Sequence, residues 1–245
     1  MCPLTATDIL RIWEIAERQG PFDQALTILA VTYPERSMDQ LADLSLAQRD
    51  RLLFKLRRQL FGSELSGFVE CPECRERLEF SLGISEICGT RPAEIAFDEQ
   101  SFSVEGFDFR FRLPNSRDLI LASACHGPQQ ARKLLIQRCL QECRREGTTV
   151  TCDELPEAVV ACVAQHVSQC DPLQEVLLDM TCPACRHRWH SLFDIVTFFG
   201  TELANQAKRL LREVHLLACA YGWREADILA MSAGRRHAYL EMVSA

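Results

Sequence analysis

Two short cysteine motifs carry the clearest chemistry in this sequence. Cys71 and Cys74 form one Cys-Pro-x-Cys motif, Cys182 and Cys185 form another, and each motif is followed by an arginine, a spacer and a second arginine. Both thiolates of such a turn point toward one place, so two facing turns supply the closed tetrahedral sulfur set that structural zinc prefers. We therefore predict one structural Zn²⁺ site made by Cys71, Cys74, Cys182 and Cys185.

The sequences around the two motifs favour a zinc ribbon over a redox dithiol. The strand-like runs ELSGFVE and RLEFSL flank the first motif, and QEVLLDMT and HRWHSLF flank the second. A redox dithiol instead predicts a Cys-x-x-Cys at the start of a helix that follows a strand. A redox pair and unligated cysteines remain the alternatives. Arg75 and Arg186 stand where a zinc ribbon usually has a small residue, often glycine, which is a mild departure from the pattern.

The chain has 13 cysteines, an odd number, and its N-terminus lacks a basic region followed by a long apolar core. This pattern predicts a cytoplasmic protein with reduced thiols rather than a disulfide framework. His187 and His190 could add ligands, although four sulfurs already complete a zinc shell. Cys139 and Cys143 could form a second metal edge with Cys125 and His126 if they lie one helical turn apart. We instead interpret that pair as small buried apolar residues. The same interpretation applies to Cys2, Cys88, Cys152, Cys162, Cys170 and Cys219.

The charge distribution and the missing motifs argue against several functions. The formal net charge of −7 weakens the case for binding a nucleic-acid backbone. A basic helix face and the arginines beside the cysteine motifs could bind phosphate, but we interpret them as solvated surface. These basic residues, expected to point outward, are Arg49, Arg51, Lys55, Arg57, Arg58, Arg75, Arg77, Arg186 and Arg188. No catalytic motif such as GxGxxG, HExxH or GxSxG is present, so we do not expect an enzyme. The sequence contains no unbroken run of about 18 apolar residues, so we do not expect a membrane-spanning helix.

Periodicity predicts mostly helices around a few short strands. Expected helices cover residues 5–20, a segment from Pro21, and 45–62, 117–125, 128–145, 156–171, 194–222, 224–231 and 233–242. Alternating phenylalanines around Glu105-Gly106 predict a β-hairpin over residues 101–114. In the longest helix, apolar side chains at steps of four and three form a narrow stripe suited to helix packing. That stripe comprises Leu203, Ala207, Leu210, Val214, Leu217 and Tyr221.

The predicted fold class is α+β, mainly helical, with a split four-cysteine zinc ribbon, a large inserted α/β subdomain and flanking helices. Because 107 residues separate Cys74 from Cys182, the ribbon must be interrupted. We expect an N-terminal helical region over 1–63 and a split ribbon made of 64–82 and 173–193. The inserted subdomain then covers 83–172, and the C-terminal long helix and helical tail cover 194–245.

Four stretches make the chain resemble the baseplate proteins of T-even-type contractile phages and of phage-tail-like contractile injection systems. They are QALTILAVTYP at 24–34, LRRQLFG at 56–62, FRLPNSRDL at 111–119 and YGWREADILAMSAGRRHAYLEM at 221–242. The resemblance implies a non-enzymatic role in building the baseplate hub, as a structural component or as an assembly chaperone. The implied partners are other baseplate, hub or tail-tube proteins, and the implied location is cytoplasmic, with incorporation into a phage-like particle. Members of this family need not carry zinc.

Two hypotheses of different kinds therefore stand. The first is a baseplate assembly or structural protein stiffened by zinc. The second is a zinc-ribbon module that binds nucleic acid, and it requires the arginines around the motifs to converge on one exposed face.

Overall fold

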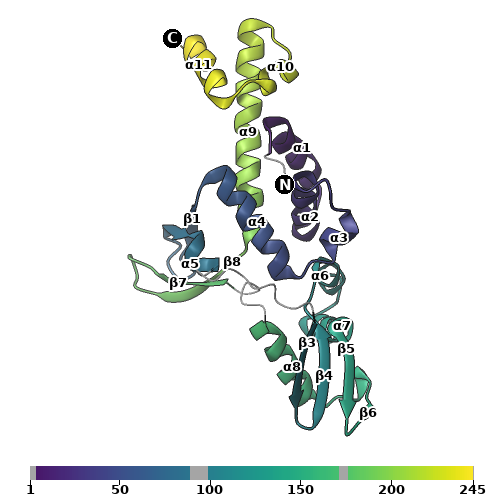
Figure 1. Cartoon of the computed structure of the whole chain (residues 1–245). Helices are drawn as coiled ribbons and strands as arrows, with labels where there is room; N and C mark the ends of the chain where they lie inside the picture. Colours follow the sequence, from purple (N-terminus) through teal and green to yellow (C-terminus); the bar gives the residue numbers. More distant parts are fainter. Residues whose placement is uncertain (1–3, 89–98, 171–175, 245) are drawn as a thin grey trace. The chain divides into compact units, whose positions relative to one another are not determined.

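The computed structural model describes residues 4–88, 99–170 and 176–244 and shows a mainly helical α+β protein with small antiparallel sheets (Figure 1). The helices are α1 (Ala6–Ala16), α2 (Pro21–Thr32), α3 (Met38–Ala42), α4 (Leu46–Phe61), α5 (Ile84–Cys88), α6 (Ser116–Ser123), α7 (Pro128–Cys139), the 3₁₀ helix η1 (Cys152–Glu154), α8 (Glu157–Cys170), α9 (Ile195–Tyr221), α10 (Glu225–Ala230) and α11 (Ala233–Ser244). The strands are β1 (Glu64–Glu70), β2 (Arg77–Gly83), β3 (Glu99–Val104), β4 (Phe107–Arg112), β5 (Leu140–Arg145), β6 (Thr148–Thr149), β7 (Val176–Thr181) and β8 (Arg188–Phe193). The mixed α+β class is confirmed.

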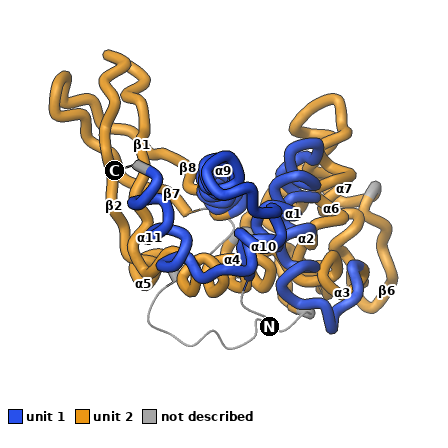
Figure 2. Tube along the Cα trace, turned by 90° about the horizontal axis from the view of Figure 1, so that it is seen from above, with its two compact units in different colours: residues 1–38, 196–245 blue, residues 39–195 orange. Residues whose placement is uncertain are grey.

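The chain divides into two compact units, coloured separately in Figure 2. Unit 1 combines residues 1–38 with 196–245, and unit 2 comprises residues 39–195. The finer division into four regions, with a split ribbon around an inserted subdomain, stays a prediction.

Unit 1 is entirely helical in its described residues, and its helix boundaries follow local sequence signals. Thr5 and Asp8 form the expected capping box at the start of α1, with the Asp8 N–H donating to the Thr5 hydroxyl. The stripe along α9 is confirmed at Leu203, Ala207, Leu210 and Leu217, which are buried. Near the C-terminus, the buried Arg236 on α11 pairs with Glu213 on α9, with 2.7 Å between Nε and the carboxylate oxygen. Packing and this ion pair together hold the C-terminal helices on α9.

The described residues of unit 2 form three separate antiparallel sheets. The hairpins β1–β2 and β7–β8 each form a two-stranded sheet, and the third sheet has the order β3-β4-β5-β6. The predicted hairpin around Glu105-Gly106 is confirmed as β3–β4, with positive φ angles of 50° and 79° in its turn. Phenylalanines from β4 pack with α7 and α8 to form a core that includes Phe107, Phe109, Ile136, Val159 and Val163.

The prediction of one helix over residues 128–145 is wrong in its last third. Helix α7 ends at Cys139, and Leu140 begins strand β5, which pairs with β4. The segment contains good helix formers, so local propensity favours a longer helix, but pairing with β4 places Cys143 in the phenylalanine core. Tertiary packing overrides local propensity here. Cys139 and Cys143 are therefore not one turn apart on a helix.

The prediction that Arg49 and Arg57 face solvent is also wrong. Their exposed fractions are only 4% and 3%, although both lie on the amphipathic helix α4. The Arg49 guanidinium pairs with Asp50 at 2.7 Å, and the Arg57 guanidinium donates to the Gly62 carbonyl at 2.9 Å. Buried arginines are tolerated because these acceptors compensate for lost hydration.

A buried polar network fixes the start of α6. The Asp118 carboxylate is fully buried and accepts two hydrogen bonds from Arg112, at 2.6 and 2.9 Å, and one from Arg138 at 2.6 Å. It also accepts from the backbone N–H of Asn115 at 3.0 Å, which completes a capping box. Burial raises the pKa of Asp118, but the bonds from Arg112, Asn115 and Arg138 outweigh it and hold the pKa below its usual value.

Within the described ranges, none of the helices combines the length and the apolar character that crossing a membrane requires.

Candidate metal centre

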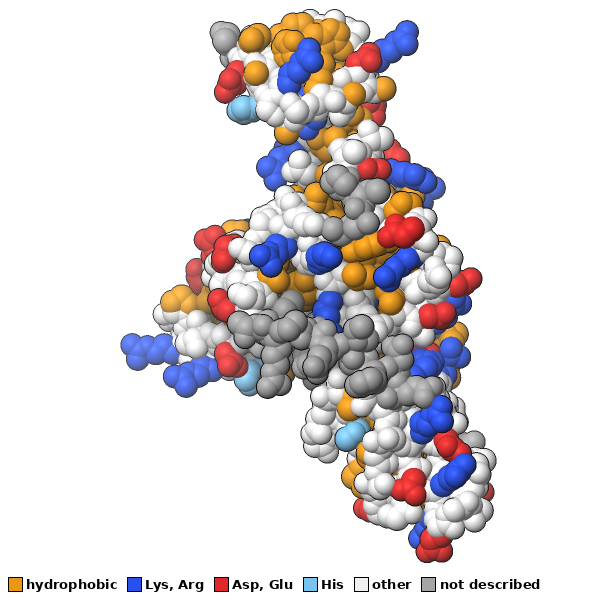
Figure 3. Space-filling view, in the orientation of Figure 1, with side chains coloured by type: hydrophobic (Ala, Val, Ile, Leu, Met, Phe, Trp, Pro, Cys, Tyr) orange, Lys and Arg blue, Asp and Glu red, His pale blue; other side chains and the backbone are white. Residues whose placement is uncertain are grey.

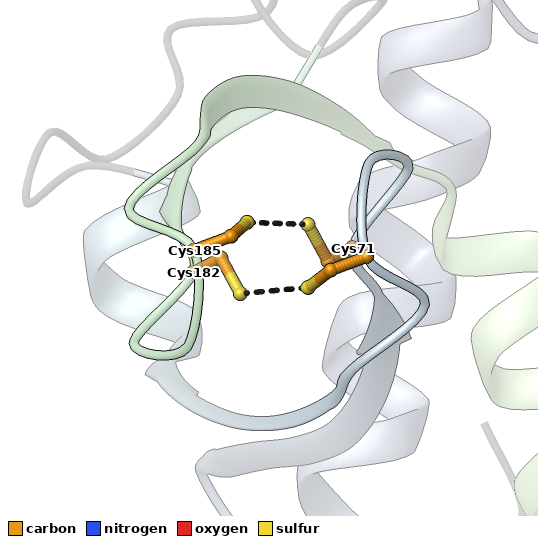
Figure 4. Close-up of side chains that lie close together, drawn as sticks. Cys71, Cys182 and Cys185 are labelled. Carbon is orange, nitrogen blue, oxygen red and sulfur yellow. Dashed lines mark hydrogen bonds between the residues drawn. The ribbon is translucent and has the colours of Figure 1, made fainter.

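The four cysteines of the two motifs come together in unit 2, although they are far apart in the sequence. The Sγ atoms of Cys71, Cys74, Cys182 and Cys185 all lie within 4.8 Å of one another. The closest pairs run between the hairpins, with Cys71 Sγ 3.6 Å from Cys185 Sγ and Cys74 Sγ 3.5 Å from Cys182 Sγ (Figure 4). The side chains of the two turns point toward each other, so one ion could contact all four sulfurs.

Each pair of cysteines lies in a tight turn between two strands, and the two turns have the same hydrogen bonds. In the first turn the Cys71 N–H donates to the Glu76 carbonyl at 2.9 Å, and the Arg75 N–H donates to the Cys71 carbonyl at 3.0 Å. In the second, Cys182 donates to the His187 carbonyl at 2.9 Å and Arg186 to the Cys182 carbonyl at 2.9 Å. The repeat seen in the sequence is therefore also a repeat of backbone structure.

The residue after each motif has an unusual backbone conformation. Arg75 and Arg186 have φ angles of 64° and 61°, in the left-handed region that costs a non-glycine residue about 1–2 kcal/mol. This explains why glycine is common at this position of a zinc ribbon. Both turns of this chain tolerate the cost with an arginine.

The first cysteine of each motif is buried and the second is exposed. Cys71 and Cys182 have no exposed surface, and Val69, Leu78 and Trp189 pack against them. Cys74 and Cys185 lie on the solvent side of the cluster. A small apolar cover on one side would shield an ion held by these sulfurs from water and competing ligands.

Backbone N–H groups of the turns lie close enough to stabilise thiolates. The N–H groups of Cys185 and Ala184 lower the pKa of the Cys182 thiol to about 7. For Cys74, the Glu76 N–H lowers the pKa, but hydrogen bonds with neighbouring thiols and burial together raise it to about 12. Four thiols held this close cannot all ionise without a cation between them, because like charges repel.

The type and spacing of the four sulfur donors fit a zinc ion. A tetrahedral ion with Zn–S bonds of about 2.3 Å requires sulfurs roughly 4 Å apart, comparable to the separations within this cluster. Four sulfurs and no oxygen donor favour Zn²⁺ or iron over magnesium or calcium. Both motifs join two strands rather than a strand and a helix, which disfavours the redox-dithiol alternative.

The two histidines considered as extra ligands lie outside the cluster. The His190 ring is 2.7 Å from Asp179, and the His187 ring stacks on Trp189. Among the residues that the structure describes, no second group of three or more His, Cys, Asp or Glu side chains has metal-binding geometry. A second metal edge at Cys139 and Cys143 therefore has no geometric support.

The remaining cysteines divide into buried and accessible ones. Cys139 and Cys143 are buried as predicted, and burial raises the pKa of Cys139 to about 12. Cys219 is exposed, which corrects the prediction for that residue, and Cys125 is half-buried. Cys152, Cys162 and Cys170 are half-buried. Cys2 and the side chain of Cys88 lie outside the described residues.

Comparison with protein families identifies the family of this chain. The sequence profile of the family described as T4 bacteriophage base plate protein matches residues 21–200. Three of the four stretches that suggested a baseplate protein lie in this range, and 221–242 lies beyond it. No curated protein and no solved structure matches the chain.

Proposed function

Because the chain belongs to the T4 bacteriophage base plate protein family, we propose that it is a non-enzymatic component of the baseplate hub of a phage-like contractile tail or injection system. It either remains in the hub as a structural subunit or acts as an assembly chaperone. The family match over residues 21–200 is the observation that carries this proposal.

Structural zinc at Cys71, Cys74, Cys182 and Cys185 is the second part of the proposal. The hairpins β1–β2 and β7–β8 share no strand ladder, and the core around their cysteines is small. Two-stranded hairpins of this size are marginally stable alone. A zinc ion between them supplies the missing cohesion, since structural zinc contributes on the order of 10–16 kcal/mol of apparent binding free energy.

The proposed partners are other baseplate, hub or tail-tube proteins, and the proposed location is the cytoplasm followed by incorporation into a phage-like particle. Surface chemistry supports a protein partner for unit 1. Its C-terminal end exposes Leu216, Tyr221, Met242 and Val243, and hydrophobic side chains gather there in Figure 3. Large exposed apolar side chains of this kind are typical of protein interfaces.

Co-purification tests the assembly role. The tagged protein is expressed with the spike, hub and tube proteins encoded beside its own gene, and complexes are isolated and identified. We expect a stoichiometric complex with at least one of them. Failure to bind any of them in cells that assemble particles would exclude the role.

The nucleic-acid alternative gains no support from the hairpins. The exposed Glu70, Glu73 and Glu76 lie beside Arg75 and Arg77, so the first turn is not a uniformly basic surface. Salt-dependent binding to DNA or RNA that is lost when the four arginines of the motifs are replaced would revive this alternative.

A further inference from the structure

A groove runs along the free edge of strand β7 in unit 2. It has a volume of about 410 Å³ and is lined by Val176 to Met180 of β7, by Phe80 and Leu82 of β2, and by Glu86 and Ile87 of α5. Five consecutive β7 residues line it, although successive side chains of a strand point to opposite faces. The groove therefore follows the edge of β7 rather than one of its faces.

Among the described residues, one edge of β7 pairs with β8 and its second edge has no strand partner. Alternate N–H and C=O groups of an antiparallel strand point away from its partner, so those of β7 point toward the groove. Open edges of this kind accept an added strand.

The side chains around this edge suit a strand with one apolar face. Phe80, Leu82 and Ile87 form an apolar wall beside the edge. On the outer face of the hairpin, Leu177 and Leu192 lie directly opposite each other and are 54% and 63% exposed. The apolar face of an added strand would cover the wall formed by Phe80, Leu82 and Ile87.

The acidic side chains around the groove favour an incoming strand with basic residues. Among the described residues that line the groove, Glu86 and Asp179 are the ionisable ones, and both are acidic. The His190 ring beside Asp179 leaves that carboxylate largely exposed. Basic side chains on the incoming strand would complement these acids, whereas β7 of a second copy would bring another Asp179.

We propose that this groove binds an extended segment of another tail protein, with alternating apolar and basic residues, as an added strand on β7. The inference rests on the proposed function, which supplies the partner. Because the walls of the groove come from both hairpins, the four-cysteine cluster that links the hairpins also keeps the groove assembled.

A synthetic peptide tests the proposal with the full-length, zinc-loaded protein. The probe is a fluorescein-labelled decapeptide of alternating valine and arginine, titrated at about 0.15 M salt, where long-range charge attraction is screened. Two further peptides carry N-methyl groups on all valines or on all arginines. In a strand the amides of one set point to one edge, so each peptide lacks the N–H donors of one edge.

We expect one methylated peptide to bind at least tenfold more weakly than the parent and the other to bind about as well. Equal affinities of the two methylated peptides, whether high or low, would overturn strand addition. The double variant Glu86→Gln/Asp179→Asn should weaken binding of the parent peptide about tenfold. The matched control Glu64→Gln/Glu79→Gln, which removes two exposed acids outside the groove, should leave it unchanged. Equal effects of the two double variants would contradict the acidic recognition.

Zinc content and peptide binding, measured on the same protein, distinguish a failure of the groove proposal from a failure of the zinc part of the proposed function. If the protein holds one zinc per chain but shows no methylation-sensitive binding, the groove proposal fails and the zinc proposal stands. If no zinc is bound, the zinc proposal fails, and the apoprotein then tests the groove by itself. Light scattering with and without peptide completes the test, because a dimer that the peptide dissociates would assign the groove to a second copy and overturn the proposal.

Discussion

The two-stranded hairpins and the four-stranded sheet of unit 2 are stabilised in different ways. The sheet β3-β4-β5-β6 packs phenylalanines against α7 and α8 in a continuous apolar core. Between the hairpins, the core formed by the described residues comprises Cys71, Leu78 and Cys182, with Val69 and Trp189 packed against it. A sheet with a sufficient core needs no metal, whereas small hairpins need a covalent or metal link. The difference indicates where loss of metal should act.

Loss of zinc should have the largest effect, and this effect should act on the two hairpins rather than on the four-stranded sheet. Chelation, or Cys74→Ser or Cys185→Ser, should abolish stoichiometric zinc binding and destabilise the protein strongly, since structural zinc contributes on the order of 10 kcal/mol. Metal analysis combined with denaturant unfolding measures both effects. Cys139→Ser, at a buried thiol outside the cluster, should cost about 1 kcal/mol and leave zinc bound. Equal losses of stability from Cys74→Ser and Cys139→Ser would show that the cluster cysteines matter no more to the fold than an ordinary buried thiol.

Truncation in the sheet core should destabilise the protein independently of metal. Phe109→Ala removes a buried ring from the centre of this core and should cost about 3–5 kcal/mol of unfolding free energy. Zinc content, measured on the folded variant, should stay at one per chain. A loss of zinc in this variant would show that the two regions depend on each other.

The buried carboxylate of Asp118 should make the sheet side sensitive to acid. Its pKa is below the unfolded value of about 3.9, so its stabilisation is complete above that value and is lost as pH falls through the folded pKa. Asp118→Asn should cost about 3 kcal/mol at neutral pH, because Arg112 and Arg138 lose their charged partner. The free energy of unfolding, measured from pH 6 to pH 3, should fall less for the variant than for the parent protein. Parallel pH curves would contradict this role.

Glycine at the arginine positions with positive φ should give the smallest effect, with the opposite sign. Arg75→Gly or Arg186→Gly relieves the left-handed backbone conformation and should stabilise the zinc-loaded protein by about 1 kcal/mol. Thermal unfolding with zinc present measures the gain. As a control, Arg188→Gly lies in strand β8 rather than in the turn and should destabilise the hairpin slightly. Destabilisation by all three changes would mean that the arginine side chains, rather than the backbone conformation, matter.

Local signals in the sequence were sufficient for most helix and hairpin boundaries. The capping box at Thr5 and the turn at Glu105-Gly106 involve residues within a few positions of each other, so their physics is visible in a short window. The pairing of the two cysteine motifs was also predictable, because a tetrahedral metal requires four ligands and each motif supplies two.

The sequence by itself thus determined the repeated turns, the candidate ligands and the baseplate resemblance. Only the tertiary structure decided that residues 140–145 form a strand, that Arg49 and Arg57 are buried, and that a groove follows the edge of β7. The physical reason is the range of the interactions involved. Caps and turns depend on neighbours in sequence, whereas strand partners, burial of charge and open edges depend on segments that meet only after the chain has folded.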